Sequence, residues 1–135
     1  MPKPIRNKPV SAAEARAYAG KACEYADAAE AELKAARFVA ATSLAIHAAI
    51  NAADAVCGAR LGRRAAGEDH DQVLVLLRQA GEDGAEVEIR LRRLLPLKTK
   101  TEYEPYEIAA PVASKAVERA RHCALVSRRV AKTLG

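Results

Sequence analysis

The sequence predicts an all-α fold, an up-and-down bundle of four to five helices. Half of the 135 residues are hydrophobic, but roughly a quarter are alanine and only five are aromatic, which suits helices packed closely through small side chains. Apolar residues recur at steps of three and four along most of the chain, the spacing of one helix face. A chain of this length has room for one domain with a single core.

Residues 1–10 are expected to be a flexible basic arm, and residues 11–135 to be the helical domain. Three prolines and three positive charges leave little to bury in the arm. The first helix is expected to begin at Ser11, because Ser11 and Glu14 match a capping box. A helix running from Ser11 to Arg60 would be about 75 Å long, too long for a domain of this size, so we expect a break near 34–37.

The second helix is predicted over 38–59 and is followed by a basic loop at 60–64. Asp69 with Gln72 predicts the cap of a third helix, which runs to residue 80 and ends at Gly81.

The fourth helix is predicted over 85–95 and stops at Pro96, which cannot continue a helix. Its inward positions are expected to be Val87, Ile89, Leu91, Leu94 and Leu95. Residues 97–110 lack helical periodicity and are expected to form a structured loop. The last helix is predicted to begin near Pro111 and to run to about residue 133. Its apolar seam is Ala113, Val117, Ala120, Ala124 and Val130.

The charge and cysteine content narrow the class of protein. A formal charge of +5, from 22 basic and 17 acidic residues, gives a mixed surface that fits a partner bearing phosphates. Cys23, Cys57 and Cys123 are odd in number and lie in apolar helical contexts, which favours reduced, core-facing thiols over a metal site or a disulfide framework. The sequence has no glycine-rich phosphate loop or zinc-binding motif, so we expect neither a cofactor nor a metal.

We expect a cytoplasmic protein that does not cross a membrane. The N-terminal residues are basic but include no apolar run typical of a signal peptide. Residues 38–53 are uncharged, but they are rich in alanine and fall short of the roughly 20 strongly apolar residues of a membrane span.

A stripe of four polar residues stands out within the apolar second helix. Ser43, His47, Asn51 and Asp54 follow one another at spacings of four, four and three, so they share one narrow helix face. An unpaired buried polar group costs about 1–3 kcal/mol, and a charge costs more. We therefore expect the bundle to enclose this stripe as an internal polar network, a ligand pocket or a subunit interface.

Several features occur together and in a characteristic order. Two long leading helices carry the segment Ala-Ile-His-Ala-Ala-Ile-Asn-Ala-Ala-Asp-Ala, a short helix opens with Glu-Asp-His-Asp, and Leu-Lys-Thr-Lys-Thr-Glu-Tyr precedes a final alanine-rich helix. In this respect residues 11–133 resemble a small stand-alone HEPN domain, of the higher-eukaryote and prokaryote nucleotide-binding family. The resemblance implies a helical bundle, commonly a homodimer.

Many proteins of this family are metal-independent endoribonucleases of toxin–antitoxin, defence or RNA-processing systems, and others are not catalytic. The catalytic members carry an Arg followed by a His, paired across the dimer. Arg64 with His70, or Arg63 with His70, has that spacing here, with Gly67 between the two residues. The histidine would move a proton and the arginine would hold the phosphate as its charge builds up.

Other residues are candidates for supporting roles. Arg63, Lys98 and Lys100 are candidates for phosphate binding, and Asp54 for accepting a hydrogen bond from His70 or a lysine. Tyr103 is expected to pack its ring on the bundle. The sequence thus predicts an RNA- or nucleotide-binding protein, and a cognate antitoxin protein would be its partner in a toxin–antitoxin system. A non-catalytic homo-oligomeric interaction module with a basic face, or a structural protein without a site, remains as an alternative.

Overall fold

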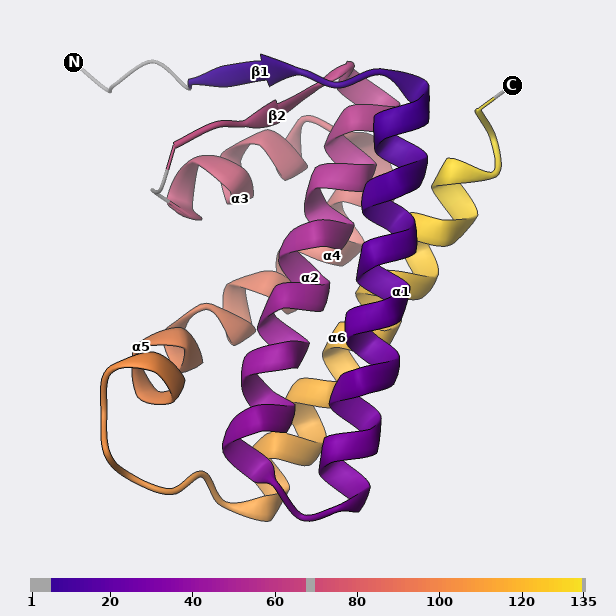
Figure 1. Cartoon of the computed structure of the whole chain (residues 1–135). Coiled ribbons are helices and arrows are strands. Elements are labelled where there is room, and N and C mark those ends of the chain that lie inside the picture. The colour runs from indigo at the N-terminus through magenta and orange to yellow at the C-terminus, as the bar shows by residue number, and fades with distance from the viewer. Residues whose placement is uncertain (1–5, 68–69, 135) are drawn as a thin grey trace, which may run out of the picture.

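The all-α fold is confirmed by a computed structural model, which describes residues 6–67 and 70–134. This part of the chain is predominantly helical, with six helices and one small two-stranded sheet (Figure 1). The helices are α1 (Ala12–Lys34), α2 (Phe38–Leu61), α3 (His70–Arg78), α4 (Gly81–Leu94), α5 (Pro96–Glu102) and α6 (Ala110–Ala131). The strands are β1 (Asn7–Pro9) and β2 (Arg63–Ala65).

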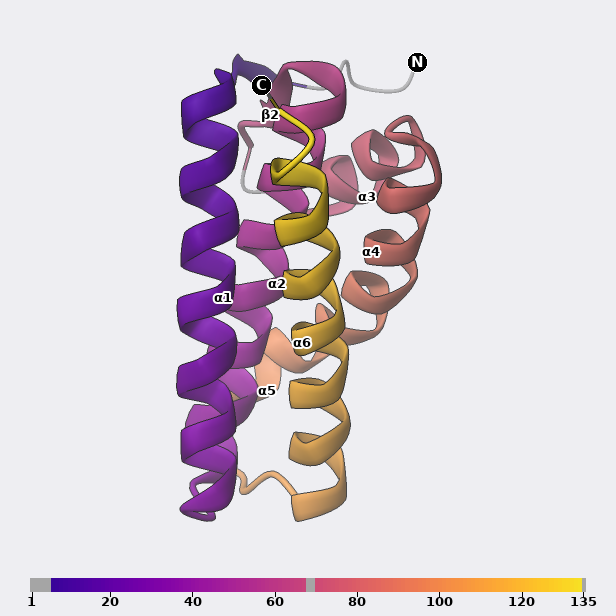
Figure 2. The ribbon, with the colours of Figure 1, turned by 90° about the vertical axis from the view of Figure 1, so that its right-hand side faces the viewer.

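The three long helices α1, α2 and α6 lie side by side and form the body of the bundle (Figures 1 and 2). In Figure 2, α3 and α4 form a further layer on the side away from α1. Alanines dominate the contacts among the long helices, whereas Leu76, Leu77, Leu91 and Leu94 bring larger side chains from α3 and α4. Small residues let the long helices approach closely, and the leucines fill the wider space beside them.

The expected first helix and the break after it are both confirmed. The Glu14 backbone N–H donates to Ser11 Oγ at 3.1 Å, and the Ser11 N–H donates to Glu14 Oε1 at 3.0 Å, so the capping box is complete. The helix ends at Lys34, and Ala36 takes a φ of 60° in the turn before α2.

The predicted apolar seam of α6 is buried along its whole length. Cys57 and Cys123 are buried thiols as expected, whereas Cys23 is only half-buried. Ile89 is a correction, because 45% of it is exposed. Val87, Leu91 and Leu94 are spaced four and three apart and define the inner face of α4, and Ile89 lies about 200° from Val87 around the helix.

The expectation of a flexible arm is wrong for residues 6–10, and residues 1–5 lie outside the described part. β1 pairs with β2 in antiparallel register, with Asn7 opposite Ala65 and Pro9 opposite Arg63. Val10 is only 7% exposed, and its N–H donates to the Gly62 carbonyl at 2.9 Å. The expected basic loop at 60–64 is also wrong, because α2 extends to Leu61, Gly62 caps it, and Arg63 and Arg64 belong to β2.

The boundaries of the shorter helices differ from those expected. α3 ends at Arg78, and Gly81, with a φ of 74°, is the first residue of α4 and not a stop. The expected cap at Asp69 lies outside the described residues. Residues 97–110 are not all loop, because α5 occupies Pro96–Glu102. Proline suits the first turn of a helix, where its missing N–H would have no partner within the helix, so Pro96 starts α5 directly after α4.

α2 is the one helix of the described chain long and apolar enough to cross a membrane by length and composition. Its most apolar window is 56% buried inside the bundle. A core helix of a soluble protein has the same length and composition, so this property alone is weak evidence for a membrane span.

Candidate functional site

The polar stripe of α2 lies at the surface of the bundle and is not enclosed as expected. His47 is exposed, and Ser43, Asn51 and Asp54 are half-buried. The Asn51 side chain donates to the His47 carbonyl at 2.8 Å, within its own helix, and the His47 ring lies 5.5 Å from the ring of Tyr25 in α1. Helical period correctly placed these residues on one face, but the neighbouring helices cover that face only in part.

Asp54 is the member of the stripe with the most altered chemistry. Burial raises the pKa of its carboxyl group to about 6, against an ordinary value of 3.8. The positive charges of Arg64 and Lys21 act in the opposite direction and lower it. Asp54 is therefore partly protonated near pH 6, at the place where α1, α2 and β2 meet.

Arg63 and Arg64 leave β2 toward different neighbours. The guanidinium of Arg64 lies over the Tyr18 ring, 5.7 Å from its centroid, and its Nη1 donates to the Ala65 carbonyl at 3.3 Å. Arg63 Nη2 donates to Gln79 Oε1 at 3.2 Å. Successive side chains of a strand point to opposite faces, so Arg64 faces α1 while Arg63 reaches the end of α3.

His70 and Lys98 lie together although 28 residues separate them in the sequence. His70 Nε2 is 2.8 Å from Lys98 Nζ, which joins the start of α3 to α5. A lysine ammonium can only donate, so in this arrangement Nε2 accepts and the ring proton is on Nδ1. Lys98 therefore meets His70, and not Asp54 as expected. Lys100 is exposed. Tyr103 is 78% exposed and does not pack on the bundle as expected.

The structure thus brings together some of the predicted residues and separates others. His70 and Lys98 form a pair where the start of α3 lies beside α5, and we call these two residues the α3–α5 edge. Asp54 and Arg64 lie at the α1–α2–β2 junction. Within one chain, Arg64 contacts Tyr18 and His70 contacts Lys98, and the pairing of Arg64 with His70 across a dimer stays a prediction.

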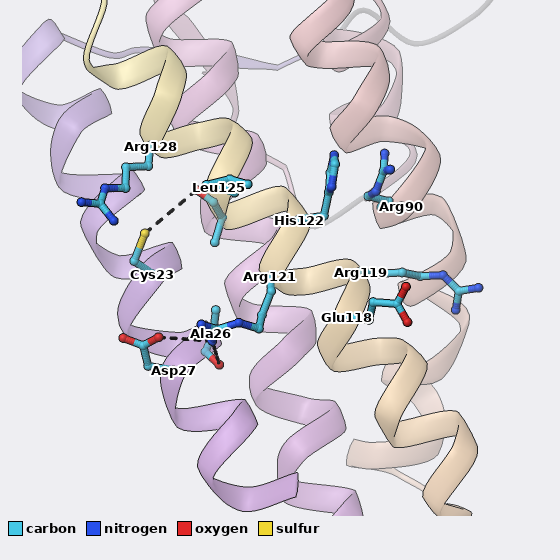
Figure 3. A pocket seen from close by; sticks show the side chains of 11 residues that line it. Cys23, Ala26, Asp27, Arg90, Glu118, Arg119, Arg121, His122, Leu125 and Arg128 are labelled. Carbon is cyan, nitrogen blue, oxygen red and sulfur yellow. Dashed lines mark hydrogen bonds and ion pairs between the residues drawn. The ribbon is translucent and has the colours of Figure 1, made fainter. Parts of the chain in front are cut away.

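A groove that the sequence did not reveal runs along the seam of α1 and α6 (Figure 3). Its larger part has a volume of about 530 Å³ and extends past α6 to Arg90 of α4. A second hollow of about 330 Å³ continues it toward the end of α6, and the two share Cys23 and Arg128. We call them together the α1–α6 groove. Its floor is formed by small residues, among them Ala19, Gly20, Cys23, Ala26, Ala124 and Ala131.

Cations outnumber carboxylates in the lining of this groove. Arg121 is neutralised, with Nη1 at 3.2 Å from Asp27 Oδ1 and 2.9 Å from Glu30 Oε2. Five other cations line the groove and form no ion pair with any described residue: Arg16, Arg90, Arg119, Arg128 and Lys132. The sequence alone could not show this groove, because the groove depends on how α1 packs against α6.

His122 occupies the wall of the groove between α6 and α4, beside Arg90 (Figure 3). Its Nε2 is buried and has no hydrogen-bond partner within the described part of the chain. Burial lowers the pKa of His122, and the positive charge of Arg90 lowers it further. Both effects favour the neutral imidazole over the charged form.

Ser43 lines a different hollow, of about 760 Å³, between the α1–α2 turn and the segment after α5. Phe38, Val39 and Ile108 give this hollow apolar walls. Within residues 6–67 and 70–134, no three His, Cys, Asp or Glu side chains gather closely enough to hold a metal ion.

Comparison of the sequence with models of known protein families and with curated proteins finds no match.

Proposed function

We propose that this protein is a HEPN-like RNA-binding protein and that the α3–α5 edge contacts the RNA. The observation that carries the proposal is the 2.8 Å approach of His70 Nε2 to Lys98 Nζ. His70, in α3, is a candidate for proton transfer, and Lys98, in α5, is a candidate for phosphate binding. An imidazole nitrogen thus lies beside a cation that can hold a phosphate oxygen.

The finer proposal is metal-independent cleavage of the RNA by a homodimer. The 2′-hydroxyl would attack the adjacent phosphorus and lose its proton to His70, and the bond from phosphorus to the 5′-oxygen would break. The departing 5′-oxygen would take up a proton from solvent water, and a 2′,3′-cyclic phosphate would remain. Lys98 would then move from His70 to a phosphate oxygen, where negative charge accumulates. As in the catalytic proteins that the sequence resembles, the arginine of such a site would come from the second copy, and its guanidinium would have to leave the Tyr18 ring that Arg64 contacts in the single chain.

Incubation of the purified full-length protein with a 5′-labelled single-stranded RNA in excess EDTA tests both forms of the proposal. We expect cutting by the unmodified protein, no cutting by His70→Ala, and strongly reduced cutting by Lys98→Gln. His47→Ala is the matched control, because it removes an exposed histidine outside the α3–α5 edge. Binding without cutting would leave the coarser proposal standing, whereas cutting and affinity that are both unchanged by Lys98→Gln would remove the α3–α5 edge from it.

A second candidate function is a non-catalytic homo-oligomeric interaction module with a basic face. It is favoured by Leu125, which is 59% exposed on α6 and lies between the cations of the α1–α6 groove (Figure 3). A large apolar side chain ringed by charge is typical of the centre of a small protein interface. Sedimentation of the unmodified protein and of Leu125→Ser distinguishes the candidates, since this module predicts an oligomer that the substitution dissociates.

A further inference from the structure

We propose that the α1–α6 groove binds the phosphate backbone of single-stranded RNA, at a surface separate from the α3–α5 edge. This inference rests on the proposed RNA binding, but it concerns residues that the argument for the α3–α5 edge does not use. In this proposal the groove contacts several phosphates along the RNA strand, whereas the α3–α5 edge contacts a single phosphate.

The unneutralised cations are the first support. Most exposed arginines elsewhere on the described bundle form an ion pair with a carboxylate: Arg37 with Glu32, Arg60 with Asp83, and Arg78 with Glu88. In the groove, Arg16 of α1 and Arg128 of α6 line the same hollow, and Lys132 lies one turn beyond Arg128. None of the three forms an ion pair with a residue of the described chain. The lining also holds the carboxylates of Asp27 and Glu118, but positive charge remains in excess, and such an excess is the electrostatic footprint of a polyanion site.

The shape of the surface is the second support. Arg128 and Lys132 lie on the side of α6 that faces α1, as Arg16 of α1 does. Arg119 lies half a turn around α6, on the side of Arg90 and α4 (Figure 3). The cations thus flank α6 on both sides over roughly 20 Å of its length, which suits the few nucleotides that single-strand sites usually hold. An acidic membrane is a broad surface that favours exposed cations on a convex or flat face, so the concave lining favours a strand over a lipid bilayer.

His122 is the third support and also supplies a readout. Its buried Nε2 has no described partner, and the burial and the positive charge of Arg90 lower its pKa. A phosphate bound near Arg90 and Arg119 would offset that positive charge, so the pKa of His122 would rise when the groove is filled. A structural role for the arginines would not change the titration of His122 in the presence of RNA.

The binding experiment uses a fluorescent 2′-O-methyl oligouridylate of about 12 nucleotides, which cannot be cut through a 2′-hydroxyl. Affinity is measured by fluorescence anisotropy between about 50 and 200 mM salt. If all five free cations of the groove contact phosphates, the logarithm of affinity should fall against the logarithm of salt with a slope of about −3.5. Arg16→Gln with Arg128→Gln should weaken binding roughly tenfold and make the slope shallower by about 1.4.

The matched control is Lys34→Gln with Arg93→Gln, which removes two exposed cations outside the groove. This control should leave the slope and the affinity close to those of the unmodified protein. Equal loss in both double variants would overturn the groove in favour of general charge attraction, and no loss in the groove variant would overturn it outright. Circular dichroism of each variant verifies that the helices are retained.

The other arms separate this inference from its rivals. Lys98→Gln and His70→Ala test the α3–α5 edge. We expect these two variants to lose RNA cutting and to keep binding of the oligonucleotide to the groove. Variants that keep cutting but lose oligonucleotide binding would overturn the inference. Co-sedimentation with phosphatidylserine vesicles tests whether the groove binds an acidic membrane instead. Our inference would be contradicted if the unmodified protein bound vesicles but not RNA, and if Arg16→Gln with Arg128→Gln abolished the vesicle binding. In an NMR titration, the pKa of His122 should rise with the oligonucleotide in the unmodified protein, and an unchanged value would also count against it.

Discussion

Val10 packs directly against the α-carbon of Gly58, which connects the segment after β1 to the last turn of α2. A Cβ placed on Gly58 would lie 2.5 Å from Val10 Cγ1 and 3.3 Å from Ala15 Cβ. Glycine is therefore required here by a close approach and not by an unusual backbone angle. Since Val10 follows β1, this contact also helps to fix the position of the β-ribbon on the bundle.

We expect Gly58→Ala to lower the free energy of unfolding by about 1–3 kcal/mol, because the added methyl group overpacks this contact. The penalty should shrink in a Val10→Ala background, where the methyl group has room. Urea denaturation of the two single variants and the double variant measures the coupling. Gly20→Ala is the control, because nothing lies within 4 Å of its added Cβ, and it should stabilise α1 by about 0.5–1 kcal/mol. If the losses in the free energy of unfolding of the two single variants simply add in the double variant, the contact between Val10 and Gly58 is contradicted.

Asp54 should make the protein less stable as the pH rises from about 4 to 6. Its folded pKa of about 6 exceeds the ordinary value of 3.8, so over this range the folded protein binds more protons than the unfolded chain. Asp54→Asn removes the ionisation and should raise the free energy of unfolding at pH 7.5 by up to about 3 kcal/mol, with little change at pH 4. Urea denaturation at both pH values measures this, and Asp27→Asn, which alters an exposed carboxylate, should keep the pH dependence.

Asp83 should show the opposite pH dependence. Hydrogen bonds from Arg60 and Arg129 lower the pKa of its carboxyl group, which links α4 to both α2 and α6. A lowered pKa contributes stability above the unfolded value, and that stability is lost as the pH falls through the folded value. Asp83→Asn should cost about 1 kcal/mol at pH 7 and nothing at strongly acidic pH, by urea denaturation. Glu82→Gln, which alters an exposed neighbour, should leave the free energy of unfolding almost unchanged. A loss as large as that of Asp83→Asn would contradict the role given to the Asp83 hydrogen bonds.

The long helices could be predicted from the sequence because their signals are local. Ser11 and Glu14 form a complete capping box within four residues, and the limit on helix length places the break close to Ala36. α5 was missed because a proline after an apolar run indicates the end of one helix and equally the first turn of another. Pro96 does both at once, and no local pattern distinguishes the two cases.

The β-ribbon and the site depended on information that is not local. β1 pairs with a segment 56 residues away, as Lys8 opposite Arg64 shows, and a strand of three residues has no periodicity to detect. The period of α2 placed Asp54 and His47 on one face correctly, but which neighbour covers that face is decided by packing. The α1–α6 groove was missed for the same reason, because Arg16 and Arg128 belong to one surface only after the helices associate.

Arg64 should hold the β-ribbon against α1 through its contact with Tyr18. A cation over an aromatic ring at a partly exposed site contributes about 0.5–1 kcal/mol, which is small for the whole domain but large for a ribbon of two short strands. Arg64→Met and Tyr18→Leu should therefore each speed amide hydrogen exchange in β1 and β2 by several-fold, while the core amides of α2 exchange as before. Combining them should add little, since either change alone removes the same contact. Arg64→Met should also raise the pKa of Asp54, because the guanidinium charge lowers it in the intact protein. Exchange that is unchanged in the ribbon, or effects that simply add, would show that β1 and β2 are held by their own hydrogen bonds and by Val10 alone.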